Sequence, residues 1–211
     1  MASRLKLTLE PQAEPLTLDE AKAHLRLDTT DDDDLIRALI RTARTMCEAF
    51  TGRALIHQGY SLFLDHWPQG DIGMSWSIVC DGNEITKFPM EVELPKPPLT
   101  TVTKINIFDA NDVASIFSPA SYYTDTASIP GRITLRDGAP IPTPGRTRNG
   151  IEIQYTAGYG VSSSSLPAPL VHGIKLLLAA LYENRGDTAE DMLKSSGCLA
   201  LFQPFRIMGL I

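Results

Sequence analysis

Four consecutive aspartates, Asp31 to Asp34, form the densest group of side chains in the sequence that could carry out chemistry. Carboxylates bind divalent cations and act as general acids or bases. A calcium-binding loop needs acids at alternate positions, a central glycine and a distal glutamate. The segment that begins at Asp28 lacks both the glycine and the glutamate. The aspartates therefore do not match a calcium loop.

The acidic segment runs directly into a segment with apolar residues at helical spacing, which places the aspartates at the start of a helix. Neighbouring helical residues point about 100° apart, so only Asp31 and Asp34 could share a face. We favour Thr30 as the N-cap with acids in the first turn, each of which stabilises a helix by about 0.3–1 kcal/mol. The alternative is a metal- or His-dependent hydrolase that uses Asp31, Asp34 and a distant histidine.

No other motif for catalysis, a cofactor or a metal is found in the sequence. The histidines form no HxxxH or HExxH arrangement, so zinc chemistry lacks support. The serine run at 162–165 is not a G-x-S-x-G nucleophile elbow. The glycines of "TAGYG" match no phosphate-binding loop. The four histidines are His24, His57, His66 and His172.

Four aromatic residues in the middle of the chain allow two interpretations: Trp67, Trp76, Tyr122 and Tyr123. They are typical of a β-domain core or an inter-subunit surface. Alternatively, they stack on the bases of a single-stranded nucleic acid. The net charge of -6 argues against the second interpretation, because nucleic-acid binding needs a basic surface.

The last seven residues, "FRIMGLI", follow Pro204 and carry one charge. Either this tail folds back on its own helices, or it docks into another chain. Full burial of such side chains contributes about 1.5–3 kcal/mol each before ordering costs, which is enough for an anchor. Its apolar members are Phe205, Ile207, Met208, Leu210 and Ile211.

Composition indicates a soluble globular protein, with 43% hydrophobic and 21% charged residues in a chain of 211. Cys47, Cys80 and Cys198 form no CxxC pair, so neither a disulfide framework nor a cysteine zinc site is expected. The N-terminus lacks the apolar region of a secretory signal. The longest apolar run, at 174–181, contains Lys175 and is too short to span a bilayer. We expect an intracellular protein that has no membrane partner.

Residues 1–54 are predicted to form two helices. Thr17 and Glu20 have the spacing of a capping box at the start of the first. The second has an apolar stripe from Leu35 to Phe50 and ends near Gly52, a residue that suits a left-handed C-terminal position. Three arginines occupy its polar side: Arg37, Arg41 and Arg44.

Residues 55–160 are predicted to form an antiparallel β-domain of five to seven strands. Short runs rich in β-branched and aromatic residues alternate with turn residues: "YSLFLDHW", "MEVELP", "TVTKINIF", "SYYTDT", "GRITL" and "GIEIQYTAGYG". Residues 161–203 return to helical spacing, with helices at about 167–184 and 188–202, and 204–211 form the tail. Neither terminal pair of helices can bury its own apolar face. We therefore expect an α+β fold, in which a discontinuous α-helical bundle carries the inserted β-domain and an extended C-terminal tail.

Four segments in this order resemble the head–tail connector (adaptor, or head-completion) proteins of tailed phages and gene transfer agents. They are "LTLDEAKAHLRLDTTDDDDLIRALIRTARTMCEAFTGRAL", "LPKPPLTTVTKINIFD", "IQYTAGYG" and "LPAPLVHGIKLLLAALYENRGD". Each alone is only a helix or strand signature, but their succession over residues 16–187 is specific. Residues 65–90 and the tail lie outside the resemblance.

The resemblance implies a non-enzymatic structural protein, without a cofactor, that forms a twelve-fold homo-oligomeric ring beneath the portal. Such rings extend the DNA channel and give a stopper or tail-tube protein its docking surface. DNA passes through the lumen without sequence-specific binding. The expected location is the neck of a virion or phage-like particle assembled in a bacterial cytoplasm.

The resemblance also bears on two sets of residues. In relatives, the C-terminal segment commonly inserts into the portal, which favours docking over folding back for Phe205, Ile207, Met208, Leu210 and Ile211. Contacts between neighbouring subunits of the ring are expected around Arg37, Arg41 and Arg44.

Overall fold

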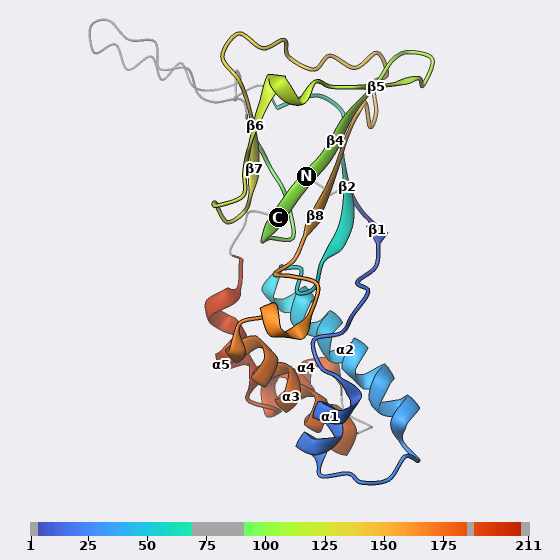
Figure 1. Cartoon of the computed structure of the whole chain (residues 1–211), viewed down its shortest axis with the longest axis vertical. Helices are drawn as coiled ribbons and strands as arrows, with labels where there is room; N and C mark the ends of the chain where they lie inside the picture. Colours follow the sequence, from blue (N-terminus) through green and yellow to red (C-terminus); the bar gives the residue numbers. More distant parts are fainter. Residues whose placement is uncertain (1–3, 69–90, 185–187, 208–211) are drawn as a thin grey trace, which may run out of the picture. The chain divides into compact units, whose positions relative to one another are not determined.

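The computed structural model describes residues 4–68, 91–184 and 188–207 (Figure 1). These residues divide into two compact units. The β unit comprises residues 4–8, 59–68, 91–95 and 99–156. The helical unit comprises residues 9–58, 96–98, 157–184 and 188–207. No described helix is long and apolar enough to cross a membrane.

The first two helices are α1 (Leu18–Leu25) and α2 (Asp33–Thr51). The predicted capping box is confirmed, because Thr17 Oγ1 accepts from the Glu20 N–H while the Glu20 carboxylate accepts from the Thr17 N–H. The predicted Thr30 cap of α2 is wrong. Asp32 occupies the N-cap position and makes no side-chain cap bond. Its Oδ2 instead accepts a hydrogen bond from the Tyr182 hydroxyl at 2.5 Å.

The C-terminal helices are α3 (Ala168–Glu183), α4 (Ala189–Ser195) and α5 (Cys198–Phe202), followed by the 3-10 turn η3 (Gln203–Phe205). Another 3-10 turn, η2 (Ser163–Ser165), precedes α3. The single last helix predicted from the sequence is wrong, because Gly197 separates α4 from α5. Its φ of 74° is a left-handed conformation that cannot continue a right-handed helix.

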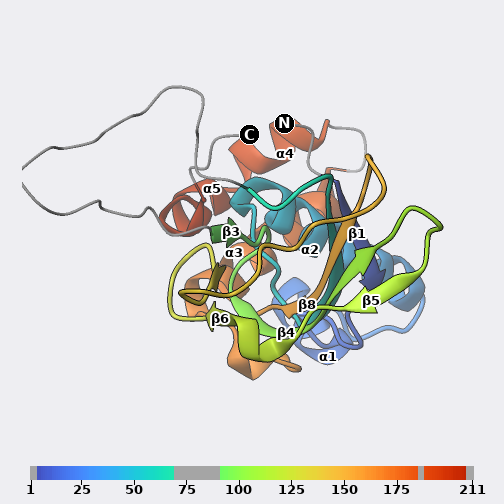
Figure 2. The ribbon, with the colours of Figure 1, turned by 90° about the horizontal axis from the view of Figure 1, so that it is seen from above.

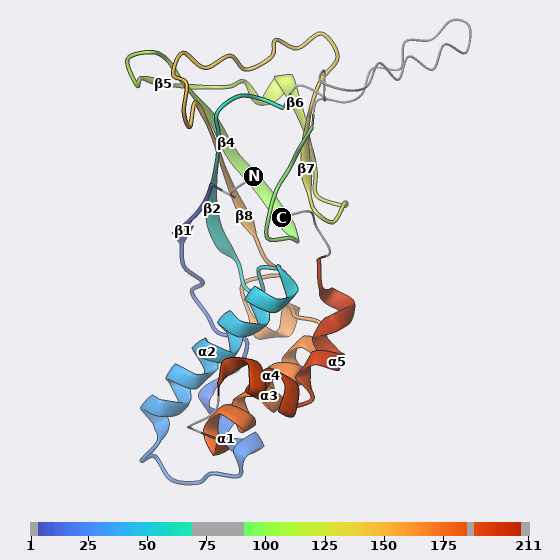
Figure 3. The ribbon, with the colours of Figure 1, turned by 180° about the vertical axis from the view of Figure 1, so that it is seen from behind.

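One apolar core joins helices from both ends of the sequence, and Figures 1 and 3 show these helices gathered together. α2 contributes four almost fully buried side chains at helical spacing: Ile36, Ile40, Ala43 and Cys47. They pack with the buried faces of α3 and α5. The main members are Ile36, Ile40, Ala43, Cys47, Leu170, Ile174, Leu177, Leu178, Cys198 and Phe202.

The β unit contains two sheets. The first has the order β1-β2-β8-β4-β5 and the second has the order β3-β7-β6. Pairing is antiparallel between β3 and β7, between β6 and β7, and between β4 and β5, whose hairpin is visible from above in Figure 2. The bounds are β1 (Leu5–Leu9), β2 (Gln58–Leu64), β3 (Glu91–Glu93), β4 (Leu99–Phe108), β5 (Ala114–Ile116), β6 (Tyr122–Asp125), β7 (Arg132–Leu135) and β8 (Ile151–Ala157). A 3-10 turn, η1 (Pro119–Ser121), precedes β6.

Each predicted β run contains a strand, and the mixed class of helices with antiparallel sheet is confirmed. Two strands, β1 and β5, were not predicted. β5 has three residues and all of them are exposed, so no apolar run or alternation marks it. β1 does alternate leucine with polar residues, but four of its five residues are exposed. Pairing with a neighbouring strand, rather than burial, makes these segments extended.

The buried side of the first sheet follows from alternation along β8, where Ile151, Ile153 and Tyr155 are all buried. Tyr155 stacks on Tyr60 with ring centroids 5.7 Å apart, and its hydroxyl donates to the Pro95 carbonyl at 2.8 Å. Stacked aromatic rings and one satisfied hydroxyl anchor this core.

Candidate docking site

The four aspartates do not converge on a common point. Asp33 Oδ1 lies 2.8 Å from Lys22 Nζ of α1, and Asp34 Oδ1 lies 2.7 Å from Arg37 Nη1. Asp32 binds Tyr182, and Asp31 is exposed. Among the described residues, no group of three or more His, Cys, Asp or Glu side chains could hold a metal ion. The metal-dependent alternative therefore has no site in this part of the chain.

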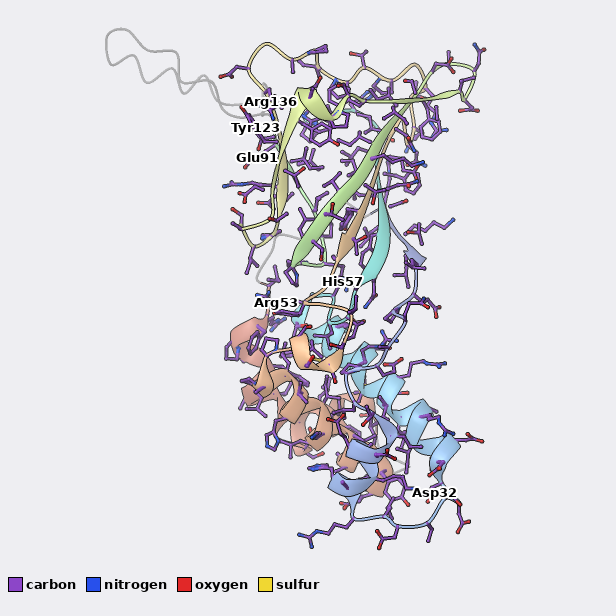
Figure 4. All side chains as sticks on the ribbon, in the orientation of Figure 1. Asp32, Arg53, His57, Glu91, Tyr123 and Arg136 are labelled. Atoms are coloured by element: carbon purple, nitrogen blue, oxygen red, sulfur yellow. The ribbon has the colours of Figure 1, made fainter. Side chains whose placement is uncertain are left out.

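Two of the histidines, His24 and His57, lie in the helical unit. Burial, followed by the charges of Lys175 and His172, lowers the pKa of His24, so its imidazole is neutral at pH 7. The backbone N–H of His57 donates to the Gly160 carbonyl at 2.9 Å, which places this residue in the helical unit (Figure 4). Ser162 Oγ lies 2.8 Å from Ser164 Oγ, so the serines contact each other.

The aromatic residues also fail to form a shared platform. Trp67 and Tyr122 are buried, and Trp76 lies outside the described residues. Tyr123 is exposed, with Arg136 Cζ 3.7 Å from its ring centroid (Figure 4). The guanidinium already occupies one face of the ring by a cation–π contact. Core packing therefore accounts for two of the four aromatics.

The beginning of the C-terminal tail is bound to the helical unit. Phe205 packs against the apolar core and is half-buried. The Ile207 N–H donates to the Thr51 carbonyl at 2.9 Å. Arg206 Cζ lies 5.2 Å from the centroid of the Phe50 ring. The predicted docking residues Met208, Leu210 and Ile211 lie outside the described residues.

We call the residues that receive the tail, Phe50–Arg53, the tail seat. Gly52 ends α2 with φ 74°, and this leaves the last helical carbonyls without partners inside the helix. The Thr51 carbonyl is one of them, and Ile207 satisfies it. The seat is thus a product of how α2 ends.

Arg53 completes the seat and is buried (Figure 4). Its Nε donates to the Phe205 carbonyl at 2.6 Å, and its guanidinium also hydrogen-bonds Tyr159. Burial raises the pKa of Tyr159, although Arg53 acts in the opposite direction. A buried guanidinium needs such acceptors, so the contact fixes where the tail leaves the helical unit. Arg53 and Phe205 are 152 positions apart, and no local sequence signal indicates their contact.

The three arginines of α2 have different environments. Arg37 and Arg41 are exposed, with Arg41 Nε 3.8 Å from Glu14 Oε1. Arg44 is buried and forms ion pairs with Glu14 at 2.8 Å and Glu48 at 3.0 Å. Burial alone would lower the pKa of Arg44, but these two carboxylates raise it overall. The Arg44 guanidinium is therefore buried within its own chain, whereas Arg37 and Arg41 lie on the surface, where they are paired with Asp34 and Glu14.

Comparison with known proteins shows which family and which solved structures this chain is similar to. A sequence model of the phage gp6-like head-tail connector proteins matches residues 15–73. A chain in the neck of an empty gene transfer agent particle, computed with C6 symmetry, is 28% identical with a TM-score of 0.73, covering 98% of this chain and 97% of that one. The chain is thus similar to head–tail connector proteins at residues 15–73 and, over nearly its whole length, to a chain from a gene transfer agent neck.

Two other solved structures contain chains similar to this one. One, in the virion of a native gene transfer agent particle, is 28% identical with a TM-score of 0.74, and the match covers 99% and 97% of the two chains. Another, in the neck of a native particle computed with C12 symmetry, is 29% identical with a TM-score of 0.70, covering 100% and 98%. No curated protein is significantly similar in sequence. The protein is thus similar over its whole length to chains from assembled particles.

Proposed function

We propose that the protein is a structural, non-catalytic connector that forms a homo-oligomeric ring in the neck of a phage-like particle. It joins the portal to a stopper or tail-tube protein and extends the channel through which DNA passes. The observation that carries this proposal is the nearly full-length similarity to chains from necks computed with C6 and C12 symmetry. The net charge of -6 also suits a lumen to which DNA must not adhere.

Within this ring the C-terminal tail docks into the portal. The tail seat holds the chain as far as Ile207 through Arg53 and Thr51, so that segment is positioned by its own subunit. The apolar residues beyond it, Met208, Leu210 and Ile211, then provide the docking side chains. Ring multiplicity converts a weak contact per tail into strong overall attachment. Arg37 and Arg41 are the exposed candidates for contacts between subunits.

The docking step is tested by truncation. Deletion from Phe205 onward also removes the Phe205 side chain, which packs against the core and could affect folding. A second variant should therefore keep Phe205 and end at Ile207. We expect the shorter deletion to keep the wild-type melting temperature but to lose attachment to portal-containing heads. Normal attachment by this folded variant would overturn the role of the tail. The matched control replaces exposed Gln203 by alanine and leaves attachment unchanged.

The connector role itself is tested in particles that lack the protein. We expect heads that are filled or empty but carry no tail, with the density of the ring missing from the neck in electron micrographs. Particles that retain complete necks and tails without this protein would overturn the proposal. This outcome is independent of how the tail residues behave.

A further inference from the structure

The β unit leaves apolar side chains exposed at both ends of its first sheet. β1 and β5 are the terminal strands of the order β1-β2-β8-β4-β5. Leu7 and Leu9 of β1 are 43% and 55% exposed, while Val113 and Ile116 at β5 are 62% and 68% exposed. Four of the eight large apolar side chains exposed in the described residues thus lie at these two edges. Such clustering marks an interaction surface, unlike scattered single residues.

In the described part of the chain, no strand pairs with the outer side of β5. The Val113 carbonyl accepts from the Asp109 N–H at 3.1 Å, and the Phe117 N–H donates to the Ile105 carbonyl at 2.8 Å. Hydrogen-bonding direction alternates along a strand, so every second residue between these positions points its backbone groups away from β4. In β5 these residues are Ala114 and Ile116. Exposed backbone donors and acceptors therefore lie beside an exposed isoleucine.

The same alternation applies to β1 at the opposite end of the sheet. The Arg4 carbonyl accepts from the Phe63 N–H of β2 at 3.0 Å. The backbone groups of Arg4 and of every second residue after it point towards β2. Those of Leu5, Leu7 and Leu9 point outward, away from β2. The exposed leucines and the unpaired side of the strand backbone thus coincide on this edge as well.

We propose that β1 of one copy pairs with β5 of the neighbouring copy, so that the first sheet continues from subunit to subunit. This inference rests on the proposed ring. A ring of identical subunits needs two different, mutually complementary surfaces on each copy. The two edges of one sheet meet that requirement, because strand addition at an open edge satisfies backbone groups and buries alternate side chains.

Charge disfavours pairing of β1 with another β1, because Lys6 is exposed and positive on both edges. Pairing with β5 avoids this repulsion. Asp112, which precedes β5, has a side chain that is 74% exposed and forms an ion pair with Arg146 at 3.0 Å. Pairing of unlike edges gives head-to-tail contacts, which close into a ring, rather than a two-fold dimer.

The contact is weak in any single pair of copies. β5 is only three residues long, and a lysine on β1 discourages unplanned pairing. Ring closure adds many such contacts at high effective concentration. The edges therefore pair stably only when copies are held together in the neck.

Disulfide trapping tests the pairing. Leu7→Cys and Ile116→Cys are combined in one chain, with Cys80→Ser, while the native Cys47 and Cys198 are buried and stay in place. The variant is co-produced with the other particle proteins, and necks are oxidised with copper phenanthroline. We expect a ladder of covalent oligomers that reaches the full ring. Chains that carry only one of the two new cysteines should give no ladder.

The outcomes separate the pairing from the ring. Rings that show no ladder, or dimers from Leu7→Cys alone, overturn the edge pairing and leave the connector role intact. Absence of the wild-type protein from necks overturns both.

If the cysteine variant is not incorporated, charge variants give the answer. Leu7→Lys and Ile116→Glu should each lower incorporation about tenfold, and the double variant should restore it. Normal incorporation of both single variants overturns the pairing, and Val161→Lys, at a residue 71% exposed elsewhere, is the control.

Discussion

At the residue scale, charged side chains that look alike in the sequence differ in what surrounds them. Arg37 and Arg44 lie on the same polar side of α2 by helical spacing. The structure leaves Arg37 exposed but buries Arg44 between Glu14 and Glu48. Glu48 also accepts hydrogen bonds from the Leu55 N–H and from Gln58. Arg44 therefore belongs to a buried polar network that connects α2 with the segment before α1.

Arg44→Ala should destabilise the protein by about 3–5 kcal/mol, because it leaves the buried Glu48 without its cation. The free energy of unfolding, measured with urea, checks this value. Arg37→Ala is the matched control on the same helix and should change stability by less than about 0.5 kcal/mol. Equal effects of the two substitutions would contradict the role of the buried network.

Glu152 of β8 should contribute to acid sensitivity. Burial acts to raise its pKa, but hydrogen bonds from Gln154, Asn106 and Ser61 outweigh burial and lower it. A folded pKa below the unfolded value of about 4.3 stabilises the fold above that pH. This contribution disappears as the pH falls through the folded pKa.

We therefore expect Glu152→Gln to lose less stability than the wild type between about pH 5 and pH 3. Urea midpoints measured across this range test the expectation. Exposed Glu93→Gln serves as the control and should follow the wild-type curve. Parallel curves for Glu152→Gln and the wild type would show that the hydrogen bonds do not lower the folded pKa.

At the scale of elements, the ends of helices decide the candidate docking site. The left-handed Gly52 ends α2 and opens the Thr51 carbonyl to Ile207, while the left-handed Gly197 turns the chain between α4 and α5. The turn leads into Phe202, which packs in the core beside α3. Together these breaks bring the start of the tail back to the tail seat.

Gly173→Ala should destabilise the packing of α3 on α5. A Cβ at this position would lie 2.4 Å from Cε1 of Phe202, which is fully buried. The clash costs about 1–3 kcal/mol and outweighs the helix propensity of alanine, worth about 1 kcal/mol. Thermal unfolding of Gly173→Ala, Phe202→Leu and the double variant tests the contact. Additive losses would contradict it, because the smaller Leu should relieve part of the clash.

At the scale of the whole molecule, the two ends of the sequence complete one helical core. Ile36 and Ile40 of α2 are buried against α3, which begins more than a hundred residues later. A helix of this length gains most of its stability from such packing rather than from its own propensity. The N-terminal helices therefore depend on the C-terminal segment.

A peptide of residues 1–57 should have little helical structure alone, and it should gain helix when mixed with a peptide of residues 157–211. Circular dichroism at matched concentrations measures this change. A control peptide with Ile36→Asp and Ile40→Asp should show no gain, because charged residues cannot enter the core. Full helicity of the first peptide alone would contradict the dependence.

Local patterns predicted much of the fold. The capping box at Thr17 and Glu20, the Gly52 end of α2 and the strand within "GIEIQYTAGYG" were all predicted correctly, because each depends on neighbouring residues. The Thr30 cap failed because α2 begins at Asp33, which places Asp32 at the N-cap position. The tail seat was not predicted, since Arg53 reaches a carbonyl far along the chain.

The sequence by itself determined the type and approximate limits of most helices and strands, and the order of segments that resembles the connector family. Periodicity, caps and turn residues act over a few positions, and they can therefore be read from one chain. Only the tertiary structure decided that Arg44 is buried, that Asp32, Asp33 and Asp34 have separate partners, and that β1 and β5 are opposite edges of one sheet. These properties depend on contacts between distant residues, and pattern within a segment does not specify them.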